Sequence, residues 1–352
     1  MTSRERMRRA LTGELPDRIP LCEISIWPET VERWRSEGMP ADADPLVWLG
    51  MDPIGTSWFD GSLTLPEETL EEHEDRSLVR NTDGVTEWRW KSKTATPHKV
   101  EYLINTPDDW VTYRERLQFS PGRIPANYGE LVSQYNAAGH WFAMVPSEPI
   151  WWALMAMGFE RALEMMMDHP DVVAEMVEYQ TRLNLDLIDA ACEIAKPDAL
   201  WHFADLCYRN GMLFSPKLFR EMVLPSLRRI TDACWERGIV PMYHCCGNVT
   251  DFVPLLIEAG YACAQPFESR AGSDVCALKA MYGDQITLFG NMSVERLSGS
   301  LEEVEAEVRP KVACAAKGGR YIFHSDHSIP PTVPLENYRL ALDIAREEGS
   351  YE

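Results

Sequence analysis

The sequence lacks any uninterrupted apolar stretch long enough to cross a bilayer, and its N-terminus lacks the apolar core of a signal peptide. The chain opens instead on charged residues, in which Ser3 can cap a helix that ends near Gly13. These two absences argue against an integral membrane protein and a secreted one. They predict a cytoplasmic protein.

Positive charge is also scarce. Lysine and arginine number 34 against 55 aspartates and glutamates, which gives a formal net charge of -21. A chain with this charge repels phosphate backbones and anionic lipid surfaces. We therefore expect neither nucleic acid nor a membrane among its partners, and look to small molecules instead.

Two further patterns are missing. The nine cysteines are an odd number, scattered through apolar segments, and do not resemble a disulfide framework, so we expect free thiols in a reducing compartment. No G-x-G-x-x-G motif follows the first predicted strand, which weakens a dinucleotide-binding interpretation.

Short apolar strands that alternate with helical patterns dominate what is present. Eight strands are predicted, at about 21–26, 52–58, 141–145, 199–203, 239–244, 261–267, 285–289 and 321–324. Most are followed by a helix, which favours a parallel sheet covered on both sides, and eight such units close into a (β/α)8 barrel. We predict one barrel domain over 1–352, with a β-hairpin excursion over 62–105.

The hexapeptide Tyr-His-Cys-Cys-Gly-Asn at 243–248 follows one of these strands. Because side chains alternate along a strand, His244 and Cys246 project to the same face and Cys245 to the other. An imidazole and a thiolate side by side make half of a zinc site, and Gly247 lets the backbone turn away. The other interpretation is that both side chains simply pack at a strand end.

Polar residues follow most of the other strands, where a barrel places its chemistry. The candidates for further metal ligands or catalytic groups are Glu148, Asp205, Glu268, Asn291, His324, Asp326 and His327. Glu148, Glu268, His324, Asp326 and His327 are of ligand type, and zinc needs three or four ligands. Asp205 is either an ordinary turn residue or a catalytic or substrate-holding carboxylate.

Three other residues keep two interpretations each. His202 lies in an apolar strand and is a core or pocket-wall residue, or else a ligand. Trp151 can stack on a flat substrate or belong to the core. Arg18, within Pro-Asp-Arg-Ile-Pro, can form a structural salt bridge or bind an anionic substrate.

Four motifs together resemble the uroporphyrinogen decarboxylase superfamily over nearly the whole length. They are R-A-L-x-G-x-x-P-D-R-I-P at 9–20, N-G-x-x-F-S-P-x-x-F at 210–219, H-x-C-G-N at 244–248 and D-H-S-I-P-P-x-x-P-L-E-N at 326–337. The resemblance implies a (β/α)8 barrel with its active site at the C-terminal mouth, often in a homodimer.

The superfamily divides by chemistry. Its decarboxylases carry an arginine-rich segment after the first strand, whereas this chain has two acidic residues there, Glu23 and Glu29, which would repel a carboxylate-rich porphyrinogen. The zinc methyltransferases of the superfamily share His-x-Cys-Gly, as at His244 and Cys246, with a later cysteine as third ligand. His327 stands at that later position here, where the decarboxylase branch also has histidine.

The resemblance therefore predicts a methyltransferase in which zinc, held by His244, Cys246 and His327, activates a thiol or similar nucleophile at the barrel mouth. The methyl group would pass between a corrinoid, either free methylcobalamin or one carried by a partner protein, or a small methylated donor, and a thiol or a pterin such as tetrahydrofolate. The alternative is a metal-independent lyase that decarboxylates a small aromatic or pyrrole with Asp205 or His327 as proton donor. A metal-binding or corrinoid-docking accessory protein is a third interpretation.

Overall fold

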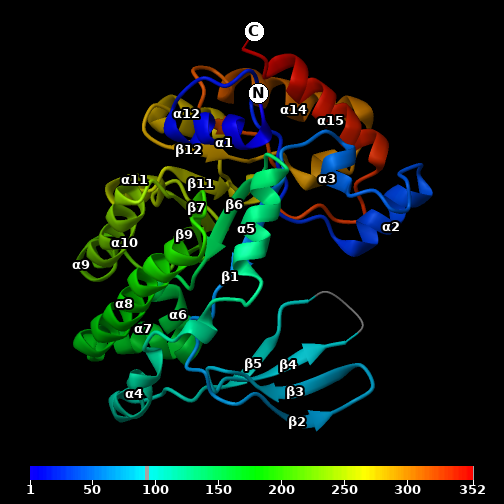
Figure 1. Ribbon diagram of the computed structural model, residues 1–352. Helices are drawn as coiled ribbons and strands as arrows, with labels where there is room; N and C mark the ends of the chain where they lie inside the picture. The colour runs from blue at the N-terminus through cyan, green and yellow to red at the C-terminus, as the bar shows by residue number, and fades with distance from the viewer. Residues whose placement is uncertain (92–94, 352) are drawn as a thin grey trace.

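A seven-stranded parallel sheet forms the centre of the computed structural model, which describes residues 1–91 and 95–351 (Figure 1). Its strands, in spatial order, are β1 (Ile54–Trp58), β6 (Trp141–Val145), β7 (Ala199–Phe203), β10 (Val240–Cys245), β11 (Cys263–Pro266), β12 (Thr287–Phe289) and β13 (Tyr321–Ile322). Spatial order follows chain order, as expected of a barrel built from successive βα units.

Helices surround this sheet, most of them along its outer face and some to one side or beyond its end (Figure 1). They are α1 (Ser3–Thr12), α2 (Pro28–Ser36), α3 (Pro45–Trp48), α4 (Pro107–Tyr113), α5 (Tyr128–Ala137), α6 (Pro149–Met157), α7 (Phe159–Asp168), α8 (Pro170–Ile194), α9 (Pro216–Met222), α10 (Leu224–Glu236), α11 (Val253–Glu258), α12 (Val275–Tyr282), α13 (Val294–Leu297), α14 (Leu301–Ala315) and α15 (Leu335–Glu348). A two-stranded ribbon, β8 (Cys207–Tyr208) with β9 (Gly211–Met212), follows β7.

Side chains alternate along each strand between two separate apolar clusters. Trp201, Met242 and Phe289 belong to a small cluster inside the sheet's curve, whereas Leu200 and Tyr243 pack in the larger cluster beneath the helices. The apolar runs of the sequence therefore reflect strands buried on both faces, as the sequence predicted.

The predicted first strand, 21–26, closes the ring by single bridges rather than by a long ladder. Leu21 pairs in parallel with Phe323 beyond β13, and its carbonyl accepts the Asp52 amide just before β1 at 2.7 Å. This segment thus lies between the last strand and the first strand of the seven-stranded sheet. The (β/α)8-type barrel predicted from the sequence is confirmed.

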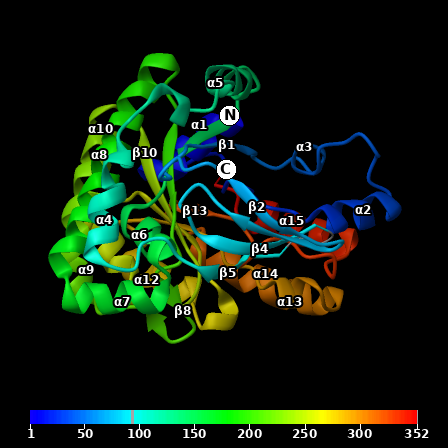
Figure 2. The same cartoon turned by 90° about the horizontal axis from the view of Figure 1, so that it is seen from below.

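The excursion at 62–105 is larger than the predicted hairpin. It is an antiparallel sheet of β2 (Glu68–Glu72), β3 (Arg76–Arg80), β4 (Thr86–Trp90) and β5 (His98–Glu101), and residues 92–94 within it lie outside the described part. The sheet follows β1 and lies at the end of the molecule away from the two termini (Figure 1). Figure 2 views the molecule from this end.

One expectation about the cysteines is wrong. Cys276 on α12 and Cys314 on α14 form a disulfide, although free thiols were expected. Their helices pack against each other, which brings the two side chains together across 38 positions of sequence. Within the described residues, no helix has the length and apolarity that a membrane crossing requires.

Candidate active site

Strand register places three side chains together at the C-terminal mouth of the barrel. His244 on β10 pairs with Phe203 on β7 and with Gln265 on β11. Residues in register on parallel strands share a face, so all three side chains meet. The Phe203 ring stacks on the His244 imidazole at a centroid distance of 4.7 Å, and His244 Nδ1 lies 2.5 Å from Gln265 Oε1.

Three potential metal donors lie within 4.8 Å of one another, on Asp205, His244 and Cys246. Within the described residues, this is the group of His, Cys, Asp or Glu side chains that could hold a metal ion. His244 Nε2 lies 3.4 Å from Cys246 Sγ and 3.5 Å from Asp205 Oδ1. The same carboxylate accepts the Cys246 amide at 3.0 Å. Asp205 comes from the loop after β7, so two strand ends build the cluster.

Gly247 and Glu268 fix the turn that presents Cys246. Gly247 has φ +89°, and an added Cβ would lie 2.8 Å from the Cys207 backbone, so both its conformation and its surroundings require glycine. Its amide donates to Glu268 Oε2 at 3.0 Å. Glu268 therefore acts on the backbone that carries the thiol.

A buried hydrogen-bond chain sets the tautomer of His244. His324 Nδ1 lies against the Ser325 carbonyl, which identifies Nδ1 as the protonated nitrogen and leaves Nε2 as an acceptor. The Gln265 amide nitrogen can then donate to His324 Nε2, at 3.4 Å, only if Gln265 Oε1 faces His244. His244 Nδ1 therefore donates to Gln265, and its Nε2 lone pair faces Cys246 and Asp205.

Glu23 ends this chain on the far side of His324. Its Oε2 lies 3.2 Å from His324 Nε2, and its Oε1 accepts the Ser325 amide and the Tyr338 hydroxyl, each at 2.9 Å. Burial raises the pKa of Glu23 to about 8, against the opposing hydrogen bonds from Ser325 and Tyr338. Burial also lowers the pKa of His324 to about 3. A neutral carboxylic acid beside a neutral imidazole avoids two unsatisfied buried charges.

The donor cluster fits a divalent cation. Burial, and next the charge of Asp205, raise the pKa of the Cys246 thiol well above its ordinary value. For Asp205, burial opposes ionisation, whereas the hydrogen bond donated by the Cys246 amide favours the carboxylate. A cation bound among the three groups would favour a thiolate and a carboxylate together, and an imidazole with its lone pair directed inward is the form that ligates metal.

A cavity of about 590 Å³ lies over this cluster. Cys246, Gly247, Asp205 and Glu268 line it from the strand ends, and Arg209 and Arg270 contribute positive charge. The Arg270 guanidinium pairs with Glu268 at 3.3 Å. The mouth therefore offers both donor atoms and space for a substrate.

The profile of the uroporphyrinogen decarboxylase (URO-D) family matches residues 147–348, more than half of the chain, including both strand ends that build this cluster. The chain belongs to the URO-D family. Curated relatives include uroporphyrinogen decarboxylases of Trichlorobacter lovleyi, 26% identical over 188 residues, and of Psychromonas ingrahamii, 34% identical over 74 residues. These alignments cover 51% and 21% of this chain, and 50% and 21% of the relatives, so the chain spans half or less of their length.

A solved structure similar in fold is a methyltransferase from Methanosarcina mazei. It superposes with a TM-score of 0.66 at 17% identity and covers 99% of both chains. At this identity the likeness shows the fold. It confirms the barrel over the whole length, including the N-terminal region that the URO-D profile does not match.

The predicted third metal ligand, His327, differs from the residue that the structure places beside His244 and Cys246, which is Asp205. His327 is not in the group of donors, and Asp205 takes that place beside His244 and Cys246. His327 lies in the last loop near His324, whose pKa it helps to lower. The URO-D motif at 326–337 suggested His327, whereas the geometry favours Asp205.

Two other predicted site residues, Asp326 and Asn291, bond to the backbone of neighbouring loops in this URO-D fold. Asp326 accepts the amides of Ser269 and Val294 at 3.1 and 3.0 Å, which ties the last loop to its neighbours. Asn291 is fully buried and its amide donates to the Ser273 carbonyl at 2.9 Å. Both residues therefore hold the loops that shape the mouth.

His202 and Arg18 lie away from the donor cluster. His202 faces the helices, bonds Tyr261 and Asn184 at 2.6 and 3.1 Å, and has its pKa lowered to about 3 by burial. Arg18 precedes the first strand and bonds Asp52 at 2.8 Å, which matches its structural interpretation. Neither residue is positioned with the three donors.

Glu148 and Trp151 lie together at the start of α6, after β6. Glu148 is the N-cap and its Oε2 accepts the Trp151 amide at 2.6 Å. Both residues line a separate cavity at the mouth. Sequence reasoning missed Gln265, Phe203 and the role of Glu23, because only strand register brings these residues to His244 and His324.

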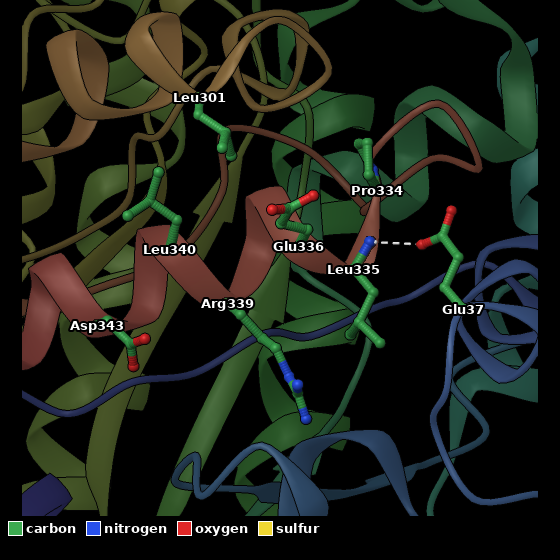
Figure 3. Close-up of a pocket in the computed structure, with 8 residues that line it drawn as sticks. All are labelled: Glu37, Leu301, Pro334, Leu335, Glu336, Arg339, Leu340 and Asp343. Carbon is green, nitrogen blue, oxygen red and sulfur yellow. Dashed lines mark hydrogen bonds between the residues drawn. The ribbon is translucent and has the colours of Figure 1, made fainter.

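A further cavity, of about 640 Å³, lies outside this site (Figure 3). It is formed by the start of α15, Leu301 and Glu37, whose carboxylate accepts the Leu335 amide at 2.7 Å. None of the donor residues lines it, so its size alone does not connect it with the chemistry.

Glu23→Gln is expected to reduce the loss of folding free energy that occurs as the pH rises. Between about pH 4.5 and 8, Glu23 is neutral in the fold and ionised in the unfolded chain, so stability falls by about 1.4 kcal/mol per pH unit as pH rises. Glutamine is neutral throughout and keeps the donor and acceptor needed by His324 and Ser325. Urea denaturation from pH 5 to 8.5 should give a shallower decline for E23Q.

The exposed Glu236 provides the matched control, because Glu236→Gln alters a side chain that is 77% exposed. Its curve should parallel the wild type. Glu148, whose pKa burial also raises to about 8, contributes its own slope to all three proteins. Equal slopes for E23Q and wild type would contradict a neutral buried Glu23.

Proposed function

We propose that this URO-D family protein is a methyltransferase that uses a metal-activated nucleophile at the barrel mouth. The observation that carries the proposal is the convergence of Asp205, His244 and Cys246 within 4.8 Å, with His244 oriented by Gln265. Zinc suits a nitrogen, sulfur and oxygen donor set with a position left open for substrate. When bound, zinc would lower the pKa of a thiol substrate so that the thiolate persists at neutral pH.

The residues of the chain then have defined tasks. Cys246, His244 and Asp205 would hold the metal, and the hydrogen bond from His244 Nδ1 to Gln265 would keep Nε2 directed toward it. Glu268 fixes Gly247 and so the position of Cys246. Methyl transfer requires little proton movement, so the main contribution of the protein is to align the nucleophile and the methyl group.

The methyl donor would be a corrinoid, free or on a partner protein, or a small methylated compound, and the acceptor a thiol or a pterin such as tetrahydrofolate. The cavity of about 590 Å³ beside Cys246 provides the approach to the open position. The likeness to the Methanosarcina mazei methyltransferase supports this choice, while the names of the curated relatives point to decarboxylation.

The decarboxylating lyase is the second candidate, because Arg209 and Arg270 line the mouth and could bind substrate carboxylates. Its proton donor would be Asp205 or His327. Asp205 accepts the Cys246 amide at 3.0 Å, which favours its carboxylate form and makes it a poor general acid. The charge state of Asp205 therefore favours the role of ligand.

Metal analysis and a methyl-transfer assay on the wild-type protein test the proposal. After reconstitution with zinc, we expect about one zinc per chain, as a single site requires. With methylcobalamin and a simple thiol, the thiolate takes the methyl group and leaves the Co–C electron pair on cobalt, so the corrinoid spectrum changes and a thioether forms. Failure to bind zinc would refute the metal site. Zinc binding with CO2 release from a carboxylated pyrrole, and no thioether, would favour the lyase.

A further inference from the structure

A second cavity at the barrel mouth, of about 410 Å³, has an unusually aromatic wall. It lies at the ends of β1, β6 and β7 and at the start of α6, and its aromatic lining comprises Trp58, Phe59, Trp151, Trp152 and Phe203. Trp58 is 60% exposed, so a large indole surface faces solvent at the entrance. Exposed tryptophan costs free energy unless something covers it, and a ligand in this cavity would do so.

Both titratable residues that line this cavity are carboxylic acids, and burial raises the pKa of Glu148 to about 8, so this residue is neutral at pH 7. Asp83 and Glu148 contribute carboxyl groups, and neither lysine, arginine nor histidine occurs among the described residues of its wall. Asp83 is held in place because its Oδ1 accepts the Trp152 indole N–H at 3.1 Å and the Leu63 amide at 3.0 Å. The Lys99 ammonium lies behind one residue of this wall, because it bonds the carbonyl of Met155 at 3.2 Å and its sulfur at 3.1 Å, and its charge also acts on Asp83.

The cavity is connected to the donor cluster by stacked rings. Trp58 packs on Phe203 at a centroid distance of 4.9 Å, and Phe203 also contacts Trp201 at 4.9 Å and His244 at 4.7 Å. Phe203 therefore separates an aromatic, acidic cavity from the residues proposed to hold the metal. A molecule bound against Phe203 would lie across this ring from His244.

We propose that this cavity is an aromatic cage for a quaternary ammonium group, the methylated end of a small methyl donor. Aromatic faces attract a cation through their negative quadrupole, and this attraction is strongest when the cation is desolvated. The methyl groups of such an ion are also apolar, so the same rings bury them favourably. The carboxylate of Asp83 adds attraction for a cation and disfavours anionic ligands, whereas Glu148 is neutral at pH 7.

The assignment rests on the proposed methyl-transfer function and specifies its donor. A thiolate that attacks one methyl carbon forms a C–S bond while the C–N bond breaks, and the electron pair of that bond returns to nitrogen. One cation and one anion thereby become a neutral tertiary amine and a neutral thioether, without any oxidant or proton donor. Both products are neutral and therefore bind a cation-selective cage more weakly than the substrate does.

Calorimetric titration of the wild-type protein with choline, and with its uncharged isostere 3,3-dimethylbutan-1-ol, tests the cage directly. The two molecules have the same shape, so the difference in affinity measures recognition of charge. We expect choline to bind about 10- to 30-fold more tightly. Equal affinities would show a neutral apolar pocket and would overturn the proposal, as would absence of binding by both.

Variants locate the binding. Trp58→Leu should weaken choline binding about 10-fold, because it removes one face of the cage, and Asp83→Asn should weaken it without removing the acceptor for Trp152. Trp235→Leu is the matched control, since Trp235 is 41% exposed on α10, away from the cavity, and should leave the affinity unchanged. Choline binding that survives Trp58→Leu would place it elsewhere and refute the assignment.

The two proposals fail in different ways. If methylcobalamin methylates the thiol but choline does not bind, the cage is wrong and the methyltransferase stands. If choline binds as expected but no methyl donor yields thioether, the cage stands as a binding site and the proposed reaction is wrong.

Discussion

Cys246→Ala is expected to reduce zinc affinity about 10²- to 10³-fold and to abolish methyl transfer at limiting metal. Structural zinc sites have binding free energies of roughly 10–16 kcal/mol shared among four ligands, so loss of one ligand removes about 2.5–4 kcal/mol. Affinity should be measured by competition with a chromophoric chelator at pH 7. Cobalt substitution adds an independent readout, because thiolate-to-cobalt absorption should disappear with the ligand.

Cys245→Ala supplies the matched control for this experiment. It makes the same chemical change one residue earlier, on a side chain that is buried on the other face of β10. Zinc affinity and the cobalt spectrum should be retained. If C246A binds zinc as tightly as C245A, Cys246 is not a ligand and the proposed centre is wrong.

Gln265→Leu provides a graded result within the same series. It leaves all three donors in place but removes the acceptor that holds the Nδ1 proton of His244. Loss of such a partner costs about 10- to 100-fold in metal affinity. In the metal-free protein, nitrogen NMR should show His244 protonated at Nδ1 in the wild type and a mixture of tautomers in Q265L. An unchanged tautomer would refute the hydrogen-bond chain through Gln265.

The sequence was informative about the fold because strands buried on both faces leave an unmistakable apolar run. The alternation that predicted His244 and Cys246 on one face is the same alternation that separates Met242 from Tyr243 in the core. The motif matches supplied the family. The insertion was placed at 62–105, but its number of strands was underestimated, because β2 is exposed along its whole length and carries no apolar signal.

The candidate site was predicted only where its residues are close in sequence. His244 and Cys246 are two positions apart, so local geometry was enough. Asp205 and Gln265 reach them through the register of β7, β10 and β11, which no single-sequence pattern specifies. Glu23 looked like a departure from an arginine-rich substrate segment, and its burial against His324 became evident only when the ends of the chain were placed side by side.

Asp52→Ala is expected to destabilise the fold by about 3–5 kcal/mol, the cost of breaking a buried ion pair from one side. The Asp52 side chain is 1% exposed and accepts from Arg6 at 2.6 Å, Arg18 at 2.8 Å and the Leu21 amide at 2.9 Å. Arg6, itself 9% exposed, would lose a buried counter-charge. Urea denaturation at constant pH measures the effect.

The position of Asp52 makes the effect larger than a count of ion pairs suggests. Asp52 exchanges backbone and side-chain hydrogen bonds with Leu21, and Leu21 pairs with Phe323, so this contact joins the first and last parts of the barrel. Asp232→Ala is the control, because its pair with Arg228 is more than half exposed and should contribute about 0–1 kcal/mol.

Hydrogen exchange tests whether the loss is local to the seam, the junction between the first predicted strand and the last strand of the barrel. In D52A, the amides of Cys22 and Phe323, which bond across this seam, should exchange with solvent faster than those of β10. Uniform exchange across the barrel would mean that the seam is no weaker than the rest, and that Arg18 and Asp52 do not act as its closure.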